Sequence, residues 1–127
     1  MVVMAGAAAL AAGCMASAPG AAQDVTDNFS EAYHARITYE ERNDAVAIPA
    51  GECNARELRR QDARHNATYK AVMARLPPAR RAALRLDERN WIAAHDRTCR
   101  RSTNEHARTK CVIDRTIKRT RHLRSYR

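Results

Sequence analysis

The segment WIAAHDRTCRRSTNEHARTKC, residues 91–111, decides the fold because it joins two predicted helices through a short polar turn. Trp91, His95 and Cys99 recur every four residues, which places them on successive turns of one helix face. Cys111 follows the turn and opens a further helix. An aromatic side chain, a polar pair and two cysteines at this spacing indicate a helical module that is held by a disulfide. The sequence therefore predicts an all-α fold.

A disulfide staple is predicted among Cys53, Cys99 and Cys111. Alanine supplies much of the 45% hydrophobic content, so the core is lean, and small domains with lean cores usually need cross-links. Closing such a loop adds roughly 3–4 kcal/mol by restricting the unfolded chain. We favour Cys99–Cys111, since its short loop needs no particular helix register, and Cys53–Cys99 is the next choice.

Residues 54–101 predict two helices that are joined at Pro77-Pro78. Asn54 can cap the first helix, and Glu57 stands three residues later, where the acid of a capping box belongs. A residue before proline avoids the helical region, so the first helix ends before the proline pair. The short connection predicts an antiparallel helical hairpin, with a third, basic C-terminal helix packed across its open end.

The N-terminal residues 1–22 carry no charged side chain and are rich in small residues. Their apolar run is shorter than the roughly 20 residues that a membrane-spanning helix needs, and it indicates a signal peptide that is cleaved near Ala22. The stretch LAAGC that ends at Cys14 resembles a bacterial lipobox, so Cys14 is a lipidation candidate. The sequence therefore predicts an exported protein, periplasmic or secreted, with a lipid anchor as the alternative.

The rest of the chain divides into an extension and a domain. Residues 23–51 form an N-terminal extension, with a weak helix over 23–42 and a linker over 43–51, because Pro49 and Gly51 disfavour helix. Residues 52–127 form the helical domain.

The net charge of +9 is unevenly distributed, since all of the excess lies after residue 78. Basic segments of this kind bind nucleic acid, anionic lipid or acidic polymers. Export separates the chain from nucleic acid, and a lipid anchor would provide the only membrane contact. Arg115, Lys118 and Arg121 in the last helix are the candidates for contact with an anionic partner.

Three patterns along residues 53–124 carry spaced polar, aromatic and cysteine positions: Asp62-x3-Asn66-x2-Tyr69, Arg89-x-Trp91-x3-His95-Asp96-x2-Cys99 and Cys111-x4-Thr116-x2-Arg119-x3-Leu123. They resemble the N-terminal domain of the LprI family, which are small exported bacterial helical proteins named for a lipoprotein described as a lysozyme inhibitor. The resemblance implies a binding protein whose partner is lysozyme. A binding or scaffold module for anionic cell-envelope polymers, working through the arginine-rich C-terminal helices, is the alternative.

The chain departs from the family at several positions. The family usually has Gln at the position of Glu88, Arg at that of His95 and Leu at that of His65. It also has a further cysteine upstream of Cys53, and none occurs in residues 23–52. The mature chain is therefore left with an odd number of cysteines, so one thiol would be free or would pair between molecules.

Roles follow for some of the matched residues. Trp91 is predicted to be a core anchor between helices. Asp96 is predicted to accept hydrogen bonds from Arg119 or from the Tyr69 hydroxyl and so to hold the helices in register. His95 and the cysteines match no familiar zinc spacing, so no metal or cofactor is predicted. No nucleophile elbow or glycine-rich turn is present, so no catalytic residue is predicted.

Overall fold

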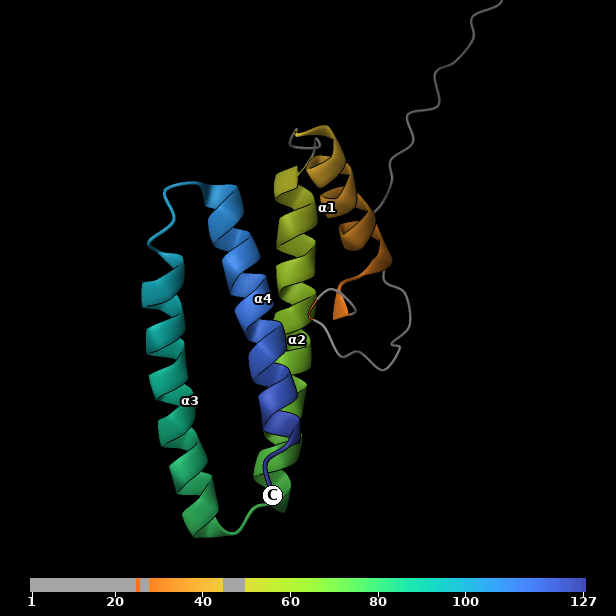
Figure 1. Ribbon diagram of the computed structural model, residues 1–127. Coiled ribbons are helices and arrows are strands. Elements are labelled where there is room, and N and C mark those ends of the chain that lie inside the picture. Colours follow the sequence, from red (N-terminus) through yellow and green to blue (C-terminus); the bar gives the residue numbers. More distant parts are fainter. Residues whose placement is uncertain (1–24, 26–27, 45–49) are drawn as a thin grey trace, which may run out of the picture.

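The structure, a computed structural model, describes residues 25, 28–44 and 50–127. The described residues form four α-helices and no strand, which confirms the prediction of an all-α fold (Figure 1). In chain order these helices are α1 (Glu31–Asn43), α2 (Ala50–Arg75), α3 (Pro78–Cys99) and α4 (Glu105–Arg124). The leader, residues 1–22 with Cys14, and the middle of the predicted linker lie outside the described residues.

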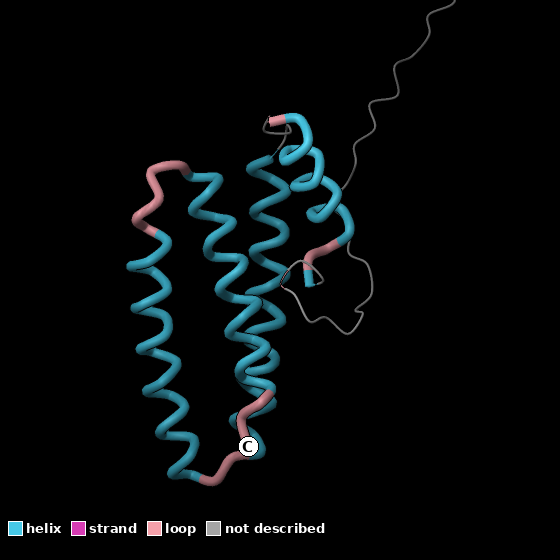
Figure 2. Tube along the Cα trace, in the orientation of Figure 1, coloured by secondary structure: helices cyan, strands magenta, loops and turns pink. Residues whose placement is uncertain are grey.

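The three long helices stand side by side and are joined by short loops (Figure 2). Helix α2 runs in one direction, α3 returns in the other after Leu76 and Pro77, and α4 then runs back alongside α2. Helix α4 packs mainly against α2 and less extensively against α3. It therefore runs along the bundle, whereas the sequence predicted that it would pack across the open end. The buried residues of α4 run from Ile113 to Leu123, and they need burial along that length.

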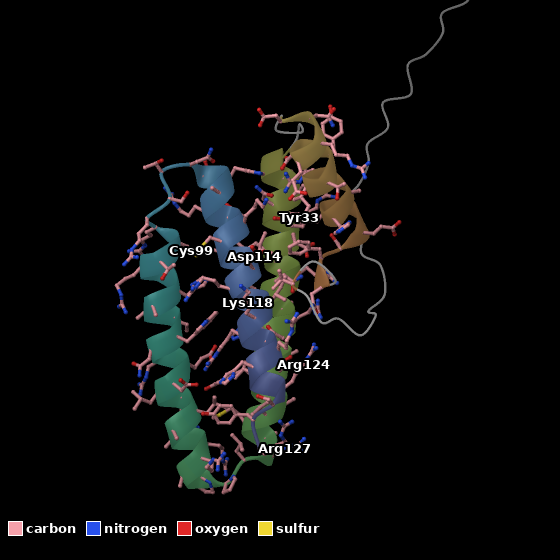
Figure 3. The ribbon with its side chains drawn as sticks, viewed as in Figure 1. Tyr33, Cys99, Asp114, Lys118, Arg124 and Arg127 are labelled. Carbon is pink, nitrogen blue, oxygen red and sulfur yellow. A yellow bond between two sulfur atoms is a disulfide. The ribbon has the colours of Figure 1, made fainter. Side chains whose placement is uncertain are left out.

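The core has two parts. At the end of the molecule near α1, Tyr33 and Ile37 pack with Ile113 and Ile117 of α4. Figure 3 shows Tyr33 between α1 and α2. The predicted N-terminal extension thus contributes two buried side chains to the same core as α4.

The second part of the core lies near the proline turn. Val72 and Leu76 of α2, Leu84 of α3 and Leu123 of α4 are all buried there. Three helices meet at this cluster, and Pro78 at the first turn of α3 suits a position where no backbone N–H is needed.

Helix α2 begins at Ala50, four residues before the predicted start at Asn54. Asn54 and Glu57 are buried inside the helix and do not cap it. Glu57 instead accepts hydrogen bonds from the backbone N–H and the hydroxyl of Ser30, the residue that caps α1, with a hydroxyl distance of 2.6 Å. The capping-box prediction was wrong because the two polar side chains are used in tertiary contacts.

Asn54 belongs to a polar network that joins three helices. It accepts a hydrogen bond from Arg36 of α1, and its amide nitrogen lies 3.0 Å from Nδ1 of His106 in α4. His106 Nε2 lies 3.1 Å from Glu40, which also pairs with Arg36. The network closes on itself through Arg36, Asn54, His106 and Glu40, although Arg36 Nε is buried there without a hydrogen-bond partner among the described residues.

A disulfide joins Cys99 at the end of α3 to Cys111 in α4, with a Cα–Cα distance of 5.6 Å. This is the favoured pairing, and Figure 3 shows Cys99 beside the loop between α3 and α4. Cys53 is also disulfide-bonded, and none of the described cysteines is free. None of the described helices is long and apolar enough to cross a membrane.

Candidate functional site

A groove of about 560 Å3 opens between α2 and α3, with α4 closing one side. Residues spaced three and four apart on α2 and α3 point into it, as expected of two helix faces that oppose each other. The lining residues are Asp62, His65, Asn66 and Tyr69 from α2, Arg85, Glu88, Arg89, Trp91, Ile92, His95 and Asp96 from α3, and Thr116 from α4.

Glu88 lies at the centre of the groove wall and links all three long helices. Its Oε1 lies 2.7 Å from Nε2 of His65 in α2. Its Oε2 accepts a hydrogen bond of 2.8 Å from Nε of Arg119 in α4. Arg119 also donates from its Nη2 to Asp87, again at 2.8 Å. The carboxylate therefore holds α2, α3 and α4 together at a point where α2 and α3 make little other contact.

The charges of this cluster are stabilised by one another. Burial alone would raise the pKa of Glu88, but the hydrogen bonds from His65 and Arg119 outweigh it and hold the pKa below its usual value. Burial would lower the pKa of Arg119, whereas hydrogen bonds to Asp87 and Glu88 raise it. Glu88 is therefore ionised at neutral pH, and its two oxygens face His65 and Arg119 on the neighbouring helices.

Trp91 forms a half-buried aromatic wall. Its ring lies between two imidazoles, with centroid distances of 5.2 Å to His65 and 4.8 Å to His95. The guanidinium of Arg119 lies over the ring at 5.6 Å from its centroid. Trp91 belongs to neither core cluster, so the prediction of a core anchor is corrected: the indole is fixed by polar side chains and faces the groove.

The rim of the groove carries polar side chains with unused bonding capacity. Asp62 and Asn66 of α2 and Arg85 and Arg89 of α3 are exposed. None of these four forms a hydrogen bond or an ion pair with another described residue. Burial raises the pKa of the Asp62 carboxyl, and the nearby charges of His65 and His95 oppose that shift. Groups of this kind are free to bind a ligand.

His95 is buried and only half satisfied. Its Nδ1 lies 3.2 Å from Oδ1 of Asp96, while its Nε2 is buried without a hydrogen-bond partner among the described residues. Asp96 also lies 3.7 Å from Arg100. The expected hydrogen bonds to Asp96 from Arg119 or Tyr69 are not found, because Arg119 is engaged by Glu88 and Asp87.

The residues singled out from the sequence fall into three places. Apart from the two cysteines, the family patterns name ten residues, and eight of them line the groove: Asp62, Asn66, Tyr69, Arg89, Trp91, His95, Asp96 and Thr116. Arg119 lies behind the groove wall, and Leu123 is in the core near the proline turn. Of the residues predicted to bind an anionic partner, Lys118 is exposed, whereas Arg115 and Arg121 are partly buried.

Sequence reasoning missed the importance of Glu88 and His65. Both were noted only as departures from the family, although Glu88 lies on the same helix face as Leu84, Trp91 and His95 at three- and four-residue spacing. An acid on that otherwise inward face signals a buried partner, and the partner is a histidine on the facing helix.

The groove offers the chemistry of a binding site. It combines an aromatic wall with carboxylate, amide and guanidinium groups. Among the residues that the structure describes, no group of three or more His, Cys, Asp and Glu side chains is placed to hold a metal ion.

Comparison with known proteins gives a family match. The family model described as Lysozyme inhibitor LprI matches residues 40–123, well over half of the chain. No curated protein and no solved structure gave a significant match. The chain belongs to the LprI lysozyme inhibitor family.

Proposed function

We propose that this member of the LprI family is an exported protein that inhibits lysozyme by binding it. The family match over residues 40–123 carries the proposal, because it spans the end of α1 and nearly all of the bundle formed by α2, α3 and α4. The Cys99–Cys111 disulfide supports export, since such bonds persist in oxidising compartments.

Charge restricts how the inhibitor meets lysozyme. A chain with a net charge of +9 repels a basic lysozyme at long range. Contact therefore needs a local region of opposite charge. The end of α1 and the start of α2 lie at the same end of the molecule (Figure 1) and carry three exposed acids, Glu41, Asp44 and Glu52. We call these three residues the acidic end and assign the lysozyme contact to it.

The acidic end can be changed without disturbing the fold. Asp44 caps α1 in the left-handed backbone region, with φ of 47°, and Asn is well tolerated there. Among the described residues, Glu52 forms an ion pair with exposed Arg56, and such surface pairs contribute little to stability. The triple variant Glu41→Gln, Asp44→Asn, Glu52→Gln should therefore fold like the parent.

A lysozyme-activity assay with the oxidised chain tests the proposal at several ionic strengths. We expect the parent to inhibit lysozyme, and the acidic-end variant to inhibit at least tenfold less well, a change of about 1.4 kcal/mol. The matched control, Arg115→Gln, Lys118→Gln, Arg121→Gln, should inhibit equally well or better because it reduces the long-range repulsion. Full lysozyme activity at every salt concentration would reject inhibition.

The salt dependence separates inhibition from the binding of an anionic envelope polymer. Salt screens the repulsion between two basic proteins, so inhibition should hold or improve as ionic strength rises toward about 0.15 M. Binding of a basic helix to a polyanion weakens over the same range. Polymer binding that is lost in the Arg115, Lys118 and Arg121 variant, together with no inhibition by the parent, would support the polymer function instead.

A further inference from the structure

The groove is separate from the acidic end and has a recognition chemistry of its own. Trp91 is the only tryptophan in the chain, and its ring is held by His65, His95 and Arg119. Because these contacts fix the indole while leaving part of it exposed, the groove presents a rigid aromatic plane to a ligand. Such a plane packs well against the C–H face of a sugar ring, and little side-chain entropy is lost on binding.

The rim supplies hydrogen-bonding groups of both kinds. Asp62 offers acceptors, Arg85 and Arg89 offer donors, and Asn66 offers both. None of these side chains bonds to another described residue. Adjacent hydroxyl groups, each of which both donates and accepts, match a rim of this composition.

The charge distribution selects against charged ligands. An anion in the groove would meet the carboxylates of Asp62 and Asp96, and a cation would meet Arg85 and Arg89. A wholly apolar ligand would bury these groups without partners, which costs free energy for each of them. An uncharged ligand with many hydroxyl groups and one apolar face avoids all three penalties.

The size of the groove suits such a ligand. Its volume of about 560 Å3 lies within the roughly 300–1,000 Å3 that is typical of small-molecule sites. We propose that the groove between α2 and α3 binds an uncharged oligosaccharide, with one pyranose ring stacked on Trp91 and its hydroxyls bonded to Asp62, Asn66 and Arg89.

Tryptophan fluorescence tests the proposal directly, because Trp91 supplies all of the tryptophan emission. The oxidised chain is titrated with the β-1,4-linked trimer of N-acetylglucosamine and, separately, with cellotriose, which has hydroxyls in place of the acetamido groups. We expect a saturable change in Trp91 emission with at least one trisaccharide. Tighter binding of the first would show that acetamido groups are recognised.

Variants locate the binding site. Asp62→Ala and Arg89→Ala should each weaken binding by about tenfold or more, since each removes hydrogen bonds to the sugar. Arg97→Ala is the matched control, because Arg97 is an exposed arginine of α3 that does not line the groove. Circular dichroism should show equal helix content in all three variants, whose altered side chains are exposed.

The outcome is independent of lysozyme inhibition, because the titration contains no lysozyme. The absence of a saturable change with either trisaccharide up to about 10 mM, the range of very weak binding, would overturn the proposal. Equal affinity in the parent, Asp62→Ala and Arg89→Ala would also overturn it, since the sugar would then bind elsewhere. Loss of sugar binding in Asp62→Ala with inhibition retained would support a groove that acts separately from the acidic end.

Discussion

The two sides of helix α2 differ in how they meet the neighbouring helices. Toward α4 and α1 it buries apolar side chains, and Asn54 makes polar contacts with Arg36 and His106. Toward α3 it meets its neighbour closely only near the proline turn, where Leu84 joins the core. Beyond that turn the two helices are separated by the groove, which His65, Glu88 and Trp91 bridge. The side of α2 that packs on α4 and α1 therefore stabilises the bundle, whereas the side that faces the groove has polar groups available to bind a ligand.

The largest expected effect comes from truncating the packed side. Ile113→Ala should lower the free energy of unfolding by about 2–5 kcal/mol, because Ile113 is fully buried and its loss leaves a cavity. Ile92→Ala, on the groove side, should change it by no more than about 0.5 kcal/mol, since Ile92 is 45% exposed. Denaturant unfolding of the two variants measures both values. Similar losses would show that the two sides of the bundle contribute alike.

Removing the disulfide should act mainly on α3. The double variant Cys99→Ser, Cys111→Ser should lose about 3 kcal/mol, the value expected for a short loop. Because α3 is tied to the bundle at its two ends and at Glu88, its amide hydrogens should exchange faster while those in the middle of α2 and α4 change less. Hydrogen exchange read by mass spectrometry distinguishes this pattern from a uniform loss of protection.

Truncation of the tryptophan has a smaller expected effect. Trp91→Ala should lower the free energy of unfolding by about 1–3 kcal/mol, because the ring is half-buried and belongs to neither core cluster. Thermal unfolding of the variant and the parent gives the difference. A loss of about 3–5 kcal/mol, as for a core aromatic, would place Trp91 with the packed side after all.

The smallest effect concerns the bridge across the groove. The pKa of Glu88 is lower in the folded chain than its ordinary value of 4.5. The ionised carboxylate therefore stabilises the fold above pH 4.5, and this stabilisation is lost as the pH falls through the pKa of the folded state. Glu88→Gln should lower the free energy of unfolding by about 1 kcal/mol at neutral pH. The difference between variant and parent should disappear at acid pH.

Denaturant unfolding at a series of pH values follows this difference. The raised pKa of Asp62 acts in the opposite direction, because it favours the folded state at low pH. This effect is present in both proteins, so it cancels in the difference between their free energies of unfolding. A gap that stays constant from neutral to acid pH would mean that the charge of Glu88 does not stabilise the bundle.

Local sequence signals predicted correctly where one long helix ends and the next begins. Pro77 and Pro78 place the turn between α2 and α3 correctly, and the Cys99–Cys111 pairing follows from the short loop. The start of α2 was misplaced because Asn54 and Glu57 have the residue types of a capping box, yet bind Arg36 and Ser30. Residue type and spacing do not reveal contacts with a helix that lies earlier in the chain.

The site was predicted in part. The family patterns named eight residues that line one groove, but the helix face alone could not show that α2 and α3 stand apart there. Trp91 was therefore assigned to the core, where an aromatic residue on an inward face normally packs. The separation depends on side chains from two helices, His65 and Glu88, whose partnership only the fold reveals.

The bridge across the groove also bears on how the site can be redesigned. His65, Glu88 and His95 form one connected set through Glu88 and Trp91. The apolar clusters that hold the bundle lie elsewhere. Substitutions at these three positions can therefore alter the lining of the groove while the rest of the scaffold is kept.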